Sequence, residues 1–200
     1  RKLIGALMGV VSFDNILDMC SFENNLIVCD HWHGLTLFNI NNCSVINNTI
    51  VDPYLGTIYP HETRKDYLTP LGPARLWIEN KMNSLEGNTI SNNLVSALLT
   101  KGNIGRVENN PTIGSSYTDL DETFYNWEYL DFRLKPLSAF VNTGFENIAP
   151  AIDITGMPRK SDNMTNVGAY EFSKEAIGER TLKIIAEKSD VELQSNGIMN

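Results

Sequence analysis

Two histidines and a tryptophan in the segment 30–33 form the first group of residues that could do chemistry. The segment has the sequence Asp30-His31-Trp32-His33 and holds two of the chain's three histidines. If it is extended, His31 and His33 project to the same face, because side chains alternate along a strand. Histidine can act as a base, an acid or a metal ligand near neutral pH. The alternative is a polar corner of the fold with one packed tryptophan.

A second group lies in the stretch 52–73, which carries four prolines and two glycines. Proline cannot donate to the hydrogen bonds of a central strand, so this stretch is predicted to be a loop. Functional residues concentrate on loops that a rigid scaffold holds in place. The alternative is a solvated loop without a function. The candidate residues in the loop are Tyr59, His61, Arg64, Lys65 and Tyr67.

The remaining sequence motifs do not predict a cofactor. Asp119, Asp121 and Glu122 have oxygen ligands of the kind that calcium binds, but their spacing does not match an EF-hand loop. We therefore predict a solvated acidic turn there and no cofactor. The sequence has no phosphate-binding loop, dinucleotide fingerprint or nucleophile elbow. It has no Cys-x-x-Cys pair either, which argues against a zinc site. Cys20 and Cys43 lie one period apart and are predicted to be small buried thiols.

The overall charge limits the partners. The net charge is −8 and the pI is near 4.9, which argues against nucleic acid and against an anionic membrane surface. An anionic polysaccharide remains compatible, because a local basic patch can lie in an acidic protein. No apolar segment is long enough to span a membrane. The 200 residues suffice for one domain with a sizeable core.

The elements that must position these residues repeat every 23 residues, the step from Asn25 to Asn48. Short runs of alternating apolar and polar residues predict strands with no helix between them, which is typical of a β-helix solenoid. Equivalent residues in such a stack lie about 4.8 Å apart, so stacked asparagines can bond to one another. We therefore predict a buried ladder that joins Asn24 or Asn25 to Asn47 or Asn48. The alternative is that these are loop asparagines in an Asn-rich chain.

The coils are predicted to occupy residues 1–110, with a loop insertion at 52–73. Beyond the loop we take Asn88 as the counterpart of Asn48, a step of 40, which is one coil plus a 17-residue insertion. Asn93, with a step of 45, is rejected because it would force the proline-rich loop into a strand. Residues 2–4 are in phase with residues 25–27, so we expect upstream coils of a longer chain.

The most specific sequence motifs lie between residues 131 and 172. They are Asp153-Ile154-Thr155-Gly156-Met157-Pro158-Arg159 and Gly168-Ala169-Tyr170-Glu171. Together they resemble the closing signature of right-handed parallel β-helix repeat proteins, the pectin-lyase-like superfamily. That group commonly has a glycine where Leu137 stands and an aspartate where Asn142 stands. The resemblance implies an all-β, right-handed parallel β-helix, with 111–172 as an irregular segment and a cap for the open end of the stack. The tail 173–200 is compatible with a short helix.

The resemblance also implies a function, which is to bind or cleave an acidic polysaccharide outside the cell or at its surface. Polysaccharide lyase chemistry is preferred over glycoside hydrolysis. Arg64 or Lys65 would then neutralise a sugar carboxylate. His31 or His33 would take or deliver a proton. The alternative is a non-catalytic module, such as a phage tailspike, a fibre or a surface adhesin, and oligomerisation is compatible with both. The remaining predicted substrate contacts are Asp30, Trp32, His61 and Tyr67.

Overall fold

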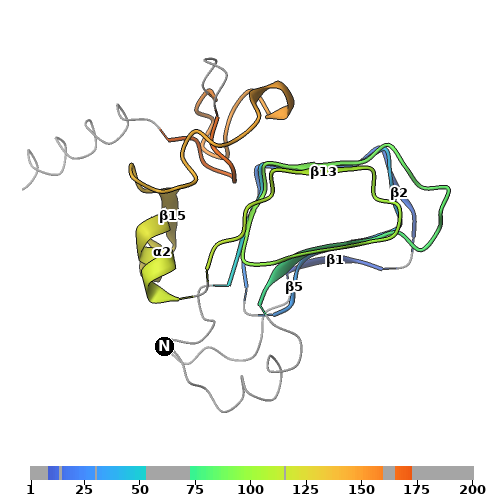
Figure 1. The fold of residues 1–200 in the computed structure, drawn as a ribbon, viewed down its shortest axis with the longest axis horizontal. Helices are drawn as coiled ribbons and strands as arrows, with labels where there is room; N and C mark the ends of the chain where they lie inside the picture. Colours follow the sequence, from blue (N-terminus) through green and yellow to red (C-terminus); the bar gives the residue numbers. More distant parts are fainter. Residues whose placement is uncertain are drawn as a thin grey trace, which may run out of the picture.

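Stacked parallel strands form the body of the protein. The structure is a computed structural model that describes residues 9–13, 15–29, 31–52, 73–114, 116–159 and 165–172. Figure 1 looks along the stack, so that successive coils overlie one another. The expected all-β, solenoid-like architecture is confirmed. The strands of the coils are β1 (Val10–Ser12), β2 (Leu17–Asp18), β3 (Ser21–Glu23), β4 (Leu26–Val28), β5 (His33–Phe38), β6 (Ile40–Asn41), β7 (Ser44–Ile46), β8 (Thr49–Val51), β9 (Arg75–Glu79), β10 (Thr89–Ser91), β11 (Leu94–Val95), β12 (Leu98–Lys101) and β13 (Arg106–Glu108).

These strands make up coil 1 (β1–β4), coil 2 (β5–β8), coil 3 (β9–β11) and coil 4 (β12–β13). Equivalent strands pair in parallel to give the sheets β1-β5-β9-β12, β3-β7-β10-β13 and β4-β8-β11, and β2 pairs with β6. Alternate side chains point inward and exclude water, which supplies the main stabilisation of the stack. Of the two cysteines predicted to be buried thiols, Cys43 is buried and Cys20 is half-buried, and Cys29 is buried as well. The inner core consists of Leu35, Leu37, Ile40, Cys43, Val45, Ile50, Leu76, Ile78, Ile90, Val95 and Ile104.

The predicted asparagine ladder is present, and it runs through all four coils. Asn25 Nδ2 donates to Asn48 Oδ1 at 2.8 Å. Asn48 Nδ2 donates to Asn93 Oδ1 at 2.8 Å, and Asn93 Nδ2 donates to Asn110 Oδ1 at 2.7 Å. The backbone N–H of each donor residue bonds to the same oxygen. The ladder therefore satisfies the polar groups of a corner where strand pairing stops.

The ladder shows that the predicted register beyond the loop is wrong. Asn93, 45 residues after Asn48, is the stacked counterpart. Asn88 lies at another corner, where its Oδ1 accepts from the backbone N–H of Cys43 at 2.9 Å. The strand pairs agree, since Val45 pairs with Ile90. The strands β10 and β11 therefore lie five residues later in the chain than the prediction placed them.

The rejected register does not need the proline-rich stretch to be a strand. The extra residues of coil 3 fall in two places rather than one. From Ile50 in β8 to Leu76 in β9 the chain spans 26 residues, against eight from Ile27 to Leu35 in the preceding coil. The turn between β9 and β10 takes up the other four residues, because it is longer than the path from β5 to β7. Assigning the whole insertion to the loop caused the error.

A second hydrophobic core covers the outer face of the β4-β8-β11 sheet. The chain leaves coil 4 and builds a compact unit against this face, to the side of the coils in Figure 1. Its apolar side chains pack on Leu26, Val28, Val51 and Leu94, which point outward from the three strands. The elements of the unit are α2 (Tyr117–Thr123), β14 (Phe124–Asn126), the 3-10 helix η1 (Trp127–Tyr129) and β15 (Asp131–Leu134), with η2 (Glu146–Ile148) further on. Its buried aromatic residues are Phe124, Trp127 and Phe132.

A row of left-handed asparagines fixes the rest of the C-terminal region to the same side. Asn24, Asn47, Asn92 and Asn109 have φ of 55°, 55°, 57° and 48°, a conformation that asparagine tolerates well. Their amides donate to backbone oxygens of Ile152, Asn166, Phe145 and Thr143 respectively. The described part of 131–172, predicted to cap the open end, therefore lies along the side of the stack and contacts every coil.

Candidate functional site

The outer face of the β1-β5-β9-β12 sheet carries the candidate site. In β9, Leu76 and Ile78 point into the core, so Arg75, Trp77 and Glu79 point outward. In β5 the pairing is irregular between His33 and Leu35, and this bulge brings His33 opposite Arg75. The bulge thus aligns a predicted site histidine with the outward side chains of the next coil.

Four aromatic rings form a column across coils 2 and 3. Trp32 stacks on His31 with ring centroids 3.8 Å apart, and His31 lies 5.3 Å from His33. His33 in turn stacks on Trp77 at 5.4 Å, with ring planes only 7° apart. Offset and parallel ring contacts of this kind each add to the energy of burial. The column brings together the side chains of His31, Trp32 and His33, which the sequence predicted as site residues.

Hydrogen bonds hold the two histidines. His31 is 8% exposed and His33 is 9% exposed. His31 Nδ1 accepts from the backbone N–H of His33 at 3.1 Å, which leaves the proton of a neutral His31 on Nε2. His33 Nδ1 lies 2.8 Å from Thr36 Oγ1. Burial lowers the pKa of His33, and the nearby charges of His31 and Arg75 lower it further. His33 is therefore neutral at neutral pH and able to accept a proton.

The depressed pKa of His33 predicts a loss of stability in mild acid. The unfolded chain binds a proton on this residue more tightly than the folded one, so its contribution is complete above pH 6.5 and is lost as the pH falls. The free energy of unfolding, measured by urea denaturation at pH 7.5 and at pH 5, should therefore decrease less for His33→Gln than for the wild type. Equal decreases in the free energy of unfolding of the two proteins would contradict a lowered pKa for His33.

Cationic side chains surround Trp77. The guanidinium carbon of Arg75 lies 6.0 Å from the Trp77 ring centroid, and Lys101 Nζ lies 5.5 Å from it. Lys81 Nζ lies 5.0 Å from the ring of Phe38. Glu79 is the acidic residue among them: it accepts from Trp77 Nε1 at 3.2 Å and pairs with Lys101 at 3.7 Å. The face therefore combines aromatic surface with an excess of positive charge.

Arg75 differs from the other cations because it is partly buried without an acidic partner. Burial lowers its pKa, and no acidic side chain of the described residues offsets that effect. Its Nε is buried and makes no hydrogen bond within the described structure. A buried donor without an acceptor costs about 1–3 kcal/mol. An anionic group bound beside Trp77 would remove that cost.

Several predicted site residues lie outside the described structure. They are Asp30, His61, Arg64, Lys65 and Tyr67. Cooperation between the 30–33 corner and the loop therefore stays a prediction. Arg75, Trp77, Glu79 and Lys101, by contrast, were not predicted as site residues. The available signal was the alternation of Leu76 and Ile78, which puts the residues between them on the outer face.

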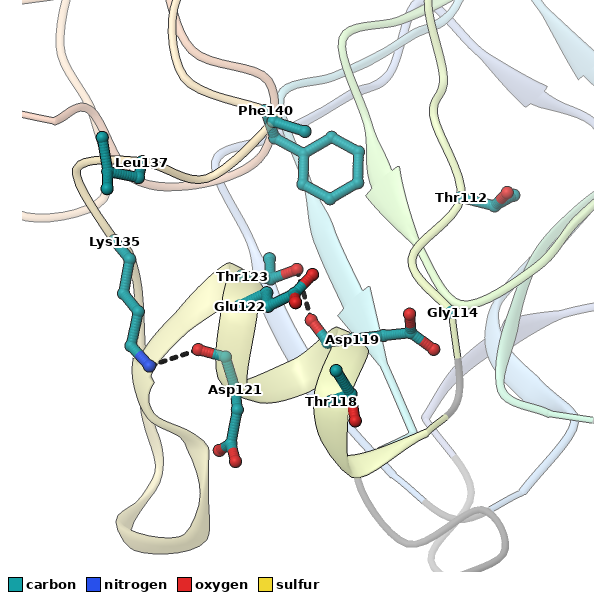
Figure 2. Close-up of a pocket in the computed structure, with 11 residues that line it drawn as sticks. Thr112, Gly114, Thr118, Asp119, Asp121, Glu122, Thr123, Lys135, Leu137 and Phe140 are labelled. Carbon is teal, nitrogen blue, oxygen red and sulfur yellow. Dashed lines mark hydrogen bonds between the residues drawn. The ribbon is translucent and has the colours of Figure 1, made fainter.

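A separate hollow of about 860 Å³ lies beside α2 (Figure 2). Asp119, Asp121, Glu122 and the ring of Phe140 line it, and Lys135 Nζ bonds to the backbone oxygen of Asp121. Two of the carboxylates have structural roles. Asp119 forms a capping box with Ser116, and Asp121 Oδ1 accepts from Trp127 Nε1 at 2.9 Å. Within the described ranges, no group of three acidic, histidine or cysteine side chains is placed to hold a metal ion.

Comparisons with known proteins give no relative. No family model, curated protein or solved structure matches the chain. Among the described residues, no helix combines the length and the apolar character needed to cross a membrane.

Proposed function

We propose that the protein is a right-handed parallel β-helix of the pectin-lyase-like kind and binds an acidic polysaccharide outside the cell or at its surface. The outer face of the β1-β5-β9-β12 sheet is the binding surface. Three features of the protein support the fold assignment: the parallel stack of strands, the asparagine ladder, and the closing motifs at 153–159 and 168–171. An extended polymer can lie on such a face, because the sheet offers a repeated, nearly flat surface.

The observation that carries this proposal is Arg75. It is a desolvated cation without an acidic partner in the described structure, beside Trp77 and the neutral His33. Arginine binds carboxylates with a fork of N–H donors, and aromatic rings contact the C–H surface of sugars. The loop residues Arg64 and Lys65 would add positive charge where the chain connects β8 to β9.

Cleavage by a lyase reaction is the second candidate, favoured by a neutral histidine next to a cation. Arg75 would neutralise the sugar carboxylate and so acidify the C5 proton. His33 would take that proton, the electron pair would form the C4–C5 double bond, and the C4–O bond would break. The departing oxygen needs a proton from an acid, a role open to His31 or His61. Binding ranks first because His33 is 9% exposed.

Glycan binding measurements test the proposal. Wild-type protein should bind at least one polysaccharide in a panel of acidic polymers at low salt, and Arg75→Gln should weaken that binding about tenfold, or about 1.4 kcal/mol. The double variant Arg64→Ala, Lys65→Ala should also weaken it, with an unchanged melting temperature, because surface changes usually shift stability by at most about 0.5 kcal/mol. A rise in absorbance from an unsaturated sugar product would reveal lyase activity.

Arg106→Gln is the matched control. Arg106 is a half-exposed arginine of β13, which belongs to a different sheet from Arg75, and it already pairs with Glu108. Binding should survive this change. If the wild type binds no acidic polysaccharide, the proposal fails and the rival function gains support. That rival is a structural or adhesive module, such as a tailspike, fibre or adhesin shaft.

A further inference from the structure

The strand β13 leaves one edge of its sheet open at the end of the stack. It pairs with β10 on one side, and no other strand of the described residues pairs with it on the other. Arg106 donates its backbone N–H to Asn88 O at 2.9 Å, so the backbone groups of Arg106 face β10. Because these groups alternate along a strand, the N–H and C=O of Val107 face the open edge. An open edge of this kind is a template for pairing with a further strand.

The side chains of β13 suit a second copy of the same strand. Val107 points inward, opposite the fully buried Ile90, yet it is 37% exposed. Arg106 and Glu108 point outward, with side chains 48% and 31% exposed. If a second β13 pairs antiparallel about Val107, the Arg106 of each copy lies opposite the Glu108 of the other. The two Val107 side chains then pack on each other and continue the hydrophobic core.

The carboxylate of Glu108 provides a second observation. Its Oε1 is buried and, apart from the ion pair with Arg106, makes no hydrogen bond within the described structure. A buried acceptor without a hydrogen-bond donor is destabilising, so this oxygen favours a further donor. The guanidinium of Arg106 from an antiparallel second copy would supply one.

We propose that β13 is the docking site for a second copy of this chain, which pairs with it antiparallel and forms a two-fold symmetric dimer. Val107 lies on the two-fold axis, where its N–H and C=O bond to those of its counterpart. The inference goes beyond the proposed glycan binding and does not depend on it. β13 lies on the opposite side of the coils from β1 and β5, which belong to the candidate face (Figure 1).

Head-to-tail stacking is the other way to join two copies, and the charges disfavour it. In the register of the stack, Glu23 has the position in β3 that Glu108 has in β13. Coil 1 of one copy next to coil 4 of another would therefore place Glu23 beside Glu108. Like charges directly opposite each other weaken strand pairing. Head-to-tail contacts would also continue into filaments, whereas antiparallel pairing closes at the dimer.

Sedimentation velocity of the full chain over a range of concentrations tests the dimer. Pairing of one short strand buries little surface, so the dimer should be weak, with a Kd on the order of 50 µM. Glu108→Arg places cations opposite each other and should raise the Kd at least about tenfold. The double variant Arg106→Glu, Glu108→Arg restores opposite charges across the axis, so its Kd should return to within about threefold of the wild type. Glycan binding and unfolding measured at about 1 µM, well below this Kd, report on the monomer.

A backbone variant tests the pairing without a change of charge. Val107→Pro removes the N–H that faces the open edge but no bond to β10, so it should give a folded monomer. Val107→Thr is the matched control, because it keeps this N–H and nearly the same volume, and it should still dimerise. Thermal melting followed by circular dichroism checks that each variant folds.

Several results would overturn the inference. The wild type could remain monomeric at about 500 µM, tenfold above the expected Kd. Folded Val107→Pro could still dimerise, or the folded double variant could fail to recover dimerisation. Stronger, open-ended association of Glu108→Arg would show head-to-tail stacking, because the new cation would face Glu23. The glycan binding measurements test the proposed function separately, so none of these results affects it.

Discussion

Replacing Asn48 with alanine should lower the free energy of unfolding by about 3–5 kcal/mol. Asn48 Oδ1 accepts from the backbone N–H of Asn25 at 3.0 Å and from its Nδ2 at 2.8 Å. Its own Nδ2 donates to Phe22 O at 2.8 Å and to Asn93 Oδ1 at 2.8 Å. Alanine removes these bonds and leaves buried donors and acceptors unpaired, each at a cost of about 1–3 kcal/mol. Urea denaturation followed by circular dichroism measures the change.

Asn25→Ala is the control for this prediction, because Asn25 is exposed and ends the described ladder. It loses its bonds where water can replace them, so its cost should be about 1 kcal/mol. Equal costs for Asn25→Ala and Asn48→Ala would mean that burial does not strengthen the ladder. Asn48→Asp should also be destabilising, because it keeps the accepting oxygen but loses the Nδ2 donors.

Arg159→Met should release the C-terminal segment from the side of the coils. Arg159 Nη1 pairs with Glu171 Oε2 at 3.3 Å, and both side chains are 2% exposed. Arg159 Nη2 also donates to Asn24 Oδ1 and to Gly168 O. Burial lowers the pKa of Arg159, and the charges of Glu171 and Asp153 oppose that shift. Removing one partner of a buried pair leaves an uncompensated charge, at a cost of about 3–5 kcal/mol.

Hydrogen exchange measures this release residue by residue. The amide of Gly168, which donates to Asn92 O at 2.7 Å, should lose protection in Arg159→Met, while amides of the inner strands should keep theirs. The double variant Arg159→Met, Glu171→Leu should recover part of the loss, because it no longer buries a lone charge. Arg106→Met, which breaks the exposed pair with Glu108, should cost less than about 1 kcal/mol. Unchanged protection of Gly168 in Arg159→Met would contradict the assigned role.

The sequence predicted the repeat but not the full register. Asn25 and Asn48 share a 23-residue step with their flanking strands, so the local pattern was sufficient to pair them. The partner of Asn48 in coil 3 could not be found the same way, because the extra residues are divided between the connection from β8 to β9 and the connection from β9 to β10. Asn88 and Asn93 are both buried corner asparagines, and a sequence pattern alone does not distinguish the two corners.

The site was harder to predict than the fold. The pair His31 and His33 stood out because histidines are rare in this chain. Tryptophan is equally rare, with three in the chain, but Trp77 and Arg75 were not predicted because their importance comes from the residues opposite them. Only the correct register places Arg75 beside His33, where no acidic side chain of the described residues pairs with it. Desolvation and charge pairing depend on contacts between coils, which local composition does not encode.

The path of the C-terminal segment has a consequence for cooperativity. A plain solenoid has contacts only between neighbouring coils, so it can fray from either end one coil at a time. Here the contact between Asn24 and Arg159 joins residues 135 positions apart. At the other end of the described stack, Asn109 Nδ2 donates to the backbone oxygen of Thr143. The segment thus couples the first coil directly to the last. Contacts of such long range slow folding, since a large loop must close before they form, but they turn a series of weakly linked coils into one cooperative unit.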